Sequence, residues 1–501
     1  MDPELQDEYL RDGLSDGMLT VVRVSHQAVQ QLMTDVGIPG LSLALVDRDG
    51  ILWSAGFGYA DKRKKVPFTT ETLSAACSFT KVFTGTAVMF AIQDGLLELD
   101  VPIIEYVPDF SVNSRFEENP HEKITLRHLL THSSGLPRET TVVNFFDLSG
   151  ASFEEHIKSI SDTWLTHKVG ERVSYSNIGM DLVAHILEVR TGKSYSEFLG
   201  ETVFEPLDMF DSSADPAVFR QRRNRAVPYM PHVEVSLEQV EAYRGAGSVF
   251  TNAKDLARFI QFHLNHGSVG GQSVLDERLI DLMYTPSPLD PNPWPNHRRD
   301  QGLGVWVLTT LKDGNHKVGH DGSGPGLTSQ GWWYPEYGFG GLVLARSSDL
   351  YQKDEKAWLD NTMKRMIAEK LVERNDDFDT VSWKTEWGSG PTYDSWRDPN
   401  AFTPFQPDWK KYTGTYRYRL AGYKLSALVR IATALFGFPP LEVKVRETDG
   451  YLEVVHCDLA WTKRHERLDQ HLPGLFFTEY GDCLDLRGEI PTWNNFRLKK
   501  R

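Results

Sequence analysis

The chain is poor in features of exported proteins. Its 501 residues include only three cysteines, Cys77, Cys457 and Cys483, too few and too scattered for a disulfide framework or a zinc cluster. It contains no Asn-x-Ser/Thr glycosylation site, and its first residues, MDPELQDEYLRDG, lack the basic start and apolar run of a signal peptide. These absences together predict a cytoplasmic protein.

Long apolar runs and basic clusters are also missing. No window approaches the roughly 18 apolar residues of a spanning helix, so no membrane span is predicted. The net charge of −15 is opposite to that of a phosphate-binding surface, and nucleic acid is not an expected partner. Residues 401–501 carry 16 basic and 12 acidic side chains, or +4, which leaves −19 for residues 1–400. This division of charge indicates two units.

The apolar periodicity predicts an α+β fold. A helix is expected over 19–33, a hairpin at Asp49-Gly50, a helix from Ser78 to Gly95, a helix-rich middle and a last helix over 355–374. Strand patterns follow the helical middle at 303–310, 316–320, 327–334 and 339–346. Because strands lie at both ends of a helical middle, we expect one antiparallel sheet flanked by helices, with a helical subdomain beside it.

Composition predicts where the domains end. Residues 1–375 form the first domain, and the polar stretch at 376–405, rich in Gly and Pro, is interpreted as a linker. Residues 406–501 contain short strand patterns typical of a small antiparallel β-barrel-like domain. An apolar stripe in KLSALVRIATALF (424–436) predicts a helical insertion, either a plug of that domain or a lid or membrane-touching element.

The first motif with possible chemistry is Ser78-Phe79-Thr80-Lys81, at the start of an apolar helix. Positions i and i+3 share a helix face, so the Lys81 amine lies within reach of the Ser78 hydroxyl, which needs a base to become a nucleophile. The helix N-terminus offers a backbone N–H to a developing oxyanion. Alternatively, Ser78 is only a helix cap and Lys81 is solvated.

Two further motifs lie at element boundaries. Tyr175-Ser176-Asn177 precedes a helix and supplies a phenol and a carboxamide, although Ser176 or Asn177 could simply cap that helix. The segment GHDGSGPG (319–326), with His320, Gly322 and Ser323, lets a substrate approach the backbone, although it could be a plain hairpin loop. The three motifs in this order favour the catalytic interpretation.

This set resembles the serine β-lactamase and penicillin-binding protein superfamily, in its class C and esterase-like branch. The segments GIPGLSLALV, TLRHLLTHSSGLP (125–137) and GAGSVFTNAKDLARF (245–259) support the resemblance over about residues 20–370. The resemblance implies that Ser78 is the acyl-accepting nucleophile, Lys81 its proton partner and Tyr175 the base. Asn177 would orient Lys81 and the substrate carbonyl, and the N–H groups of Ser78 and Ser323 would form the oxyanion hole. The terminal domain looks like a lipocalin-like appendage.

His320 stands where lactamases usually have lysine. A mostly neutral imidazole anchors a carboxylate poorly, so antibiotic hydrolysis is not the favoured activity. The resemblance implies a serine hydrolase that cleaves an ester or amide of a small molecule through an acyl-enzyme, and specialised metabolism is the expected setting. Acyl transfer, a non-hydrolytic reaction on the same fold, or a catalytically silent binding protein are the alternatives. No cofactor or metal is expected, and the oligomeric state is left open.

Other features have simpler explanations. His128 and His132 are four residues apart, but no glutamate or third ligand accompanies them. Cys77 is interpreted as a small buried filler. Aromatic residues that could line an acyl pocket are better explained by core packing; they are Phe145, Phe146, Trp164, Trp332 and Trp333.

Overall fold

The computed structural model describes most of the chain up to residue 347 and separate segments beyond it. The described ranges are 5–143, 151–228, 233–234, 242–289, 300–309, 315–347, 358–359, 362–363, 365–366, 407–418, 424–425, 442–448, 451–457, 463–472, 475–478, 483–486, 492–493 and 496–500. The predicted linker at 376–405 and most of the predicted helix at 355–374 lie outside them, and the division into domains at those positions stays a prediction.

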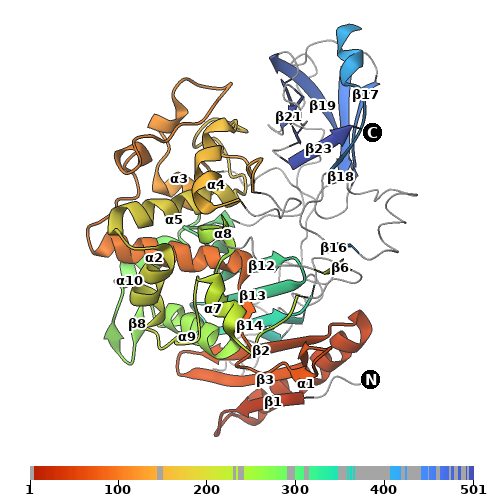
Figure 1. The fold of residues 1–501 in the computed structure, drawn as a ribbon. Helices are drawn as coiled ribbons and strands as arrows, with labels where there is room; N and C mark the ends of the chain where they lie inside the picture. Colours follow the sequence, from red (N-terminus) through yellow and green to blue (C-terminus); the bar gives the residue numbers. More distant parts are fainter. Residues whose placement is uncertain are drawn as a thin grey trace.

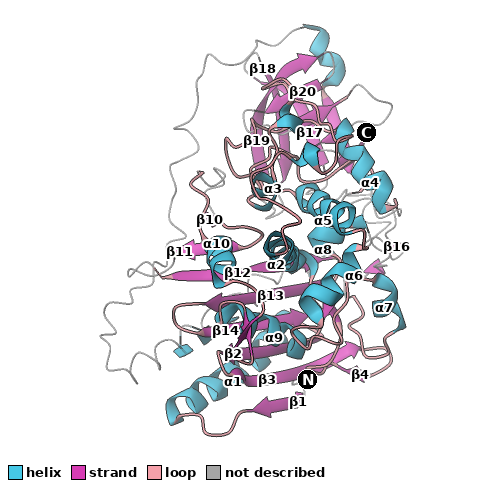
Figure 2. Cartoon of the chain, turned by 90° about the vertical axis from the view of Figure 1, so that its left-hand side faces the viewer, coloured by secondary structure: helices cyan, strands magenta, loops and turns pink. Residues whose placement is uncertain are grey.

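One antiparallel sheet joins the two ends of the first 345 residues (Figure 1). Its strand order is β1 (Leu5–Leu10), β3 (Gly50–Asp61), β2 (Gly40–Asp47), β14 (Phe339–Ala345), β13 (Leu327–Tyr334), β12 (His316–Gly324), β11 (Trp306–Thr309) and β10 (Asp300–Gln301), and β4 (Val66–Pro67) also pairs with β3. The early and late groups of strands meet where β2 pairs with β14, with Ala44 opposite Leu342. Figure 2 shows this succession from β11 to β1. The predicted sheet built from distant segments is confirmed.

The sheet has a core on each face because side chains alternate along its strands. On β2, Ala44 and Val46 join the larger core, whereas Leu43 and Leu45 join the other. The second core contains apolar residues of α1 (Asp16–Val36). On the side of the larger core, α9 (Ala253–Leu264) packs against β2 and β14. The sheet is therefore covered on both faces, as a mainly apolar β2 requires.

Helices fill the chain between the two groups of strands. They are α2 (Thr80–Gln93), α3 (Leu126–Leu130), α4 (Phe153–Ser159), α5 (Asn177–Thr191), α6 (Tyr195–Leu199), α7 (Pro216–Gln221), α8 (Arg244–Gly247) and α10 (Glu277–Tyr284). Helix α1 begins at the N-cap Ser15 and ends at Gly37, whose positive φ of 77° suits glycine. Helix α2 is buried on nearly all sides from Thr80 to Ala91, so its position is set by packing around it.

Eight strands from the last part of the chain pair in a closed ring. They are β15 (Gly414–Tyr418), β17 (Glu442–Thr448), β18 (Tyr451–Cys457), β19 (Lys463–Leu472), β20 (Leu475–Thr478), β21 (Cys483–Asp485), β22 (Thr492–Trp493) and β23 (Phe496–Lys500). The ring closes because β15 pairs with both β17 and β23. Val443 and Val445 are buried while Lys444 and Arg446 are exposed, the alternation of a small filled barrel.

Three local expectations differ from the structure. The hairpin register pairs Asp47 with Gly50, so its loop is Arg48-Asp49, one residue earlier than predicted. The first two residues of the predicted 424–436 helix form instead the short strand β16 (Lys424–Leu425), which pairs with β6 (Val233–Glu234). The rest of that segment lies outside the described residues. Residues 319–324 continue β12 because they pair with β13 up to Leu327, so only Pro325 and Gly326 form the turn.

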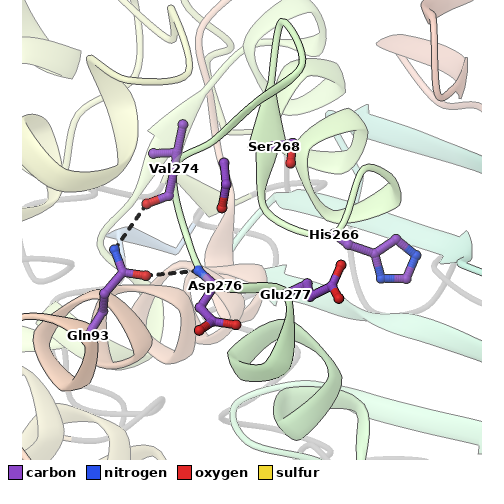
Figure 3. Close-up of a pocket in the computed structure, with 7 residues that line it drawn as sticks. Gln93, His266, Ser268, Val274, Asp276 and Glu277 are labelled. Atoms are coloured by element: carbon purple, nitrogen blue, oxygen red, sulfur yellow. Dashed lines mark hydrogen bonds between the residues drawn. The ribbon is translucent and has the colours of Figure 1, made fainter.

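A surface hollow of about 510 Å³ lies beside the end of α2 and the start of α10 (Figure 3). Its Gln93 side chain donates to Val274 O and accepts from Asp276 N, which ties the two elements together. It shares no residue with the three sequence motifs. Among the described residues, no helix combines the length and apolar character needed to cross a membrane.

Candidate active site

Ser78 lies in a tight turn that leads into α2. The turn η1 (Cys77–Phe79) follows strand β5 (Ser74–Ala75), and Cys77 adopts a positive φ of 48°, unusual for a residue with a side chain. Ser78 is half-buried, whereas Lys81, one helical turn later, is completely buried. The Lys81 Nζ donates a hydrogen bond of 2.9 Å to Ala246 O of α8, which fixes the amine in the interior.

Tyr175 is the meeting point of the motifs. The Lys81 Nζ lies 4.9 Å from the centre of its ring, and the His320 ring centre lies 6.0 Å from it. The rings of His132 and Trp306 lie 4.6 and 6.2 Å away, and the guanidinium carbon of Arg138 lies 5.1 Å above the ring. Residues 81, 175 and 320, far apart in sequence, are therefore brought together by the fold.

The histidines beside Tyr175 are buried and neutral. Burial, together with the nearby charge of Lys81, holds the pKa of His320 well below its usual value. The same causes lower the pKa of His132 to about 3. The Nδ1 of His320 donates to Asp321 O, because a carbonyl can only accept, and its Nε2 is thereby left as an acceptor. Stacking on Trp306 at 3.7 Å fixes the ring plane.

Strand β12 lies directly against the turn that carries Ser78. A Cβ built on Gly322 would be 2.3 Å from Ala76 O and 3.0 Å from Cys77 Cβ. On the neighbouring strand, Ser329 Oγ donates to the same Ala76 O at 2.5 Å. Ser323, the next residue after Gly322, is half-buried. This packing places the backbone near Ser323 beside the Ser78 turn, as a two-donor oxyanion hole needs.

Asn177 is the first residue of α5, and Ser176 is its N-cap, because Ser176 Oγ accepts from Gly179 N at 3.0 Å. The capping interpretation of Ser176 is therefore correct. The side chain of Asn177 has a different role: its Nδ2 donates to Glu139 Oε1 at 2.7 Å. In the described part of the chain, no hydrogen-bond partner is found for its buried Oδ1.

Sequence reasoning missed several groups around Tyr175. Arg138 and Glu139 directly follow the segment TLRHLLTHSSGLP. Two adjacent charged residues after an apolar stretch that contains glycine are the sequence pattern that could have indicated them as site residues. His132 was considered only as a metal ligand, but its Nδ1 accepts from Ser176 N at 3.3 Å. Trp306 lay in a predicted strand without any assigned role.

The features with simpler explanations have structural contacts. Cys77 is buried, with its Sγ 3.7 Å from Ala75 O and from Leu327 O. Trp332 and Trp333 are fully buried core residues, and Trp164 is half-buried. Phe145 and Phe146 lie outside the described residues. Within the described ranges, no group of three or more potential ligands that could hold a metal is found.

The sheet, the buried α2 and the convergence of the three motifs place the chain in the class of β-lactamase-fold proteins. A family model described as Beta-lactamase matches residues 26–361, about two thirds of the chain, and the chain belongs to this family.

Curated relatives agree over part of their length. "Protein flp" of Staphylococcus aureus strain MW2 is 26% identical over 344 residues, 66% of this chain and 65% of that protein. "Beta-lactamase-like protein 2" of Dictyostelium discoideum is 26% identical over 273 residues, 52% of this chain and 48% of that protein. The match thus spans about half to two thirds of these relatives.

Solved structures show the same fold. The octameric penicillin-binding protein homologue from Pyrococcus abyssi aligns with a TM-score of 0.58 and 21% identity over 95% of this chain and 99% of that one. D-amino acid amidase from Ochrobactrum anthropi SV3, complexed with D-phenylalanine, aligns with a TM-score of 0.57 and 23% identity over 69% of this chain and 99% of that one. SurE with D-Leu aligns with a TM-score of 0.61 and 19% identity over 96% of this chain and 100% of that one.

Proposed function

We propose that the protein is a serine acyl-enzyme hydrolase that cleaves an ester or amide of a small molecule. Ser78 is the nucleophile, Lys81 its proton partner and Tyr175 the general base. The observation that carries this proposal is the position of the Lys81 amine, 4.9 Å from the Tyr175 ring and one helical turn from Ser78. The phenol and the amine are thus held together, within one helical turn of the serine hydroxyl whose proton must be removed before its oxygen can attack.

The proposed reaction has two steps. The Ser78 hydroxyl loses its proton to Tyr175 while its oxygen attacks the scissile carbonyl, and the N–H groups of Ser78 and Ser323 stabilise the oxyanion. The bond to the leaving group then breaks, the leaving group takes the proton, and acyl-Ser78 remains. Water, deprotonated by the same base, attacks the acyl group; the acid is released and Ser78 regains its proton.

The neutral His320 bears on substrate choice. An uncharged imidazole whose Nε2 is an acceptor favours a substrate N–H or O–H over a carboxylate at that position. Two structural neighbours are D-amino acid amidase with D-phenylalanine and SurE with D-Leu. A D-amino acid amide is therefore the first substrate to test. The proposal includes a role in specialised metabolism and a cytoplasmic location.

Covalent labelling tests the proposal. The protein is incubated with a fluorophosphonate or a p-nitrophenyl ester and its intact mass is measured, with Ser78→Ala as the matched variant. We expect one adduct on the wild type and none on Ser78→Ala. A folded wild type without any adduct would favour a silent binding protein. If an adduct forms but added alcohol or amine captures the acyl group in preference to water, the enzyme is an acyltransferase.

A further inference from the structure

Glu139 is a buried carboxylate behind the candidate site. Its side chain is almost inaccessible, with the residue 1% exposed. The Asn177 Nδ2 donates to Oε1 at 2.7 Å, and the Tyr243 hydroxyl donates to Oε2 at 3.0 Å. The Arg138 Nε lies 3.7 Å from Oε1. Two distant segments of the chain thus supply hydrogen-bond donors to one carboxylate, and the neighbouring Arg138 adds an ion pair.

The carboxylate is unfavourable in this environment. Burial raises the pKa of Glu139, while Arg138, Asn177 and Tyr243 oppose the rise by favouring the ionised form. A buried charge contributes little to stability by itself, because its desolvation offsets its attractions. Its clearest local effect is on the group it binds directly, the carboxamide of Asn177.

A carboxamide has two orientations of almost the same shape, with nitrogen and oxygen exchanged. Both oxygens of Glu139 accept hydrogen bonds, from the Asn177 nitrogen and from the Tyr243 hydroxyl. The flipped orientation of Asn177 would bring two oxygens together and is therefore disfavoured. The Asn177 Oδ1 is then the end of the amide turned away from Glu139, and it is buried without a hydrogen-bond partner in the described part of the chain. A buried acceptor left unpaired is unfavourable unless a ligand or a neighbouring cation supplies a donor.

The backbone holds the same two segments together beside Tyr175. The Asn177 N donates to Arg138 O at 3.0 Å, and the Arg138 guanidinium carbon is 5.1 Å from the Tyr175 ring centre. Residues 138–139 and 175–177 therefore form one unit, in which the position of the amide and that of the phenol are linked.

We infer that Glu139 is a positioning residue that fixes the Asn177 carboxamide with Oδ1 available to an N–H donor, either the Lys81 amine or a substrate nitrogen. This inference rests on the proposed acyl-enzyme function. Glu139 does not touch the reacting atoms in this scheme, and it acts only through Asn177.

A double-mutant cycle tests this dependence. We expect Glu139→Leu to lower kcat/KM for acylation by about 10- to 100-fold, as for a misplaced site group. In an Asn177→Ala background, Glu139→Leu should lower kcat/KM by less than about twofold, because the carboxamide that Glu139 positions is already absent. Glu139→Gln, which keeps one acceptor oxygen, should recover part of the loss. Equal losses in both backgrounds, or none in either, would overturn the inference.

Tyr243→Phe is the matched structural control. It removes the other donor to Glu139 but leaves the bond to Asn177, so we expect a lower melting temperature with kcat/KM within about threefold of the wild type. If Tyr243→Phe reproduced the full loss of Glu139→Leu, general destabilisation of the region would explain both, and the positioning role would be wrong.

A readout without catalysis separates this inference from the proposed function. The side-chain amide signals of Asn177, assigned by their loss in Asn177→Ala, are followed by NMR after selective Asn labelling. A bond to a carboxylate should slow amide exchange, and Glu139→Leu should abolish that protection even if the protein never forms an acyl-enzyme. Unchanged signals in Glu139→Leu would contradict the inference, while a failure of labelling at Ser78 concerns only the proposed function.

Discussion

Replacing Gly322 by alanine tests how closely β12 must approach the nucleophile. The new Cβ would lie 2.2 Å from Ser329 Oγ and 2.3 Å from Ala76 O. Ser329 can rotate, but Ala76 O is backbone, and ordinary contacts of carbon begin at roughly 3.5 Å. The strand and the Ser78 turn must therefore separate by about 1 Å, a displacement that can cost about 100-fold in rate.

The rate of acylation is the quantity to measure for Gly322→Ala. We expect the burst rate with a p-nitrophenyl ester to fall about 10²- to 10³-fold, the cost of losing one oxyanion donor. Gly324→Ala is the matched control, because its Cβ would meet only the Cys77 sulfur, at 3.1 Å. The burst rate of Gly324→Ala should stay within about tenfold of the wild-type rate, which corresponds to a change of about 1.4 kcal/mol in the activation free energy. A folded Gly322→Ala with the wild-type burst rate would refute the proposed oxyanion geometry.

The remaining predictions concern the base, acid stability and the barrel. Tyr175→Phe should lower the acylation rate by about 10²- to 10⁴-fold in stopped-flow assays, and near-normal turnover would remove Tyr175 from its role as base. Burial lowers the pKa of His263 to about 3; the folded state then binds fewer protons than the unfolded state, and stability falls from pH 6.5 towards 3 by about 1.4 kcal/mol per pH unit. Urea unfolding at pH 7 and 5.5 should show the summed slope of His263 and the other buried histidines, His132 and His320 among them, and His263→Gln should remove only the part due to His263. A chain without residues 406–501 should still be labelled at Ser78 by the fluorophosphonate, because the contacts described for the site come from residues up to 334. If the truncated chain folded but was not labelled, the barrel would be needed for catalysis.

Local sequence was sufficient wherever a structure depends on neighbouring residues. The helix predicted over 19–33 is α1, and the structure extends it to Asp16–Val36 because the Ser15 side chain caps its start and Gly37 adopts a positive φ at its end. Ser78 and Lys81 lie on one turn because they are three residues apart. The hairpin strands β2 and β3 and the strands β11 to β14 were predicted because apolar β-forming residues recur between turn signals, whereas β1, β4 and β10 were not predicted.

Contacts between distant segments were beyond such reasoning. Residues 319–324 were predicted partly as a loop because they are rich in glycine, yet pairing with β13 makes them strand. Lys424 and Leu425 have a helical pattern, but they pair with Val233 and Glu234 about 190 residues earlier. In each case hydrogen bonds to a remote strand outweigh a weak local preference.

The sequence by itself determined the family, the nucleophile candidate and the order of the motifs, because these depend on residue type and short spacing. Only the tertiary structure decided that Lys81, Tyr175 and His320 meet, and that Glu139 holds Asn177. It also holds the pKa of His320 well below that of an ordinary histidine, because the burial and the charge of Lys81 that lower it come from residues remote in the chain. The short motifs contain the residues that we expect to react, but the burial and neighbouring charges that set their positions and pKa values exist only in the folded chain.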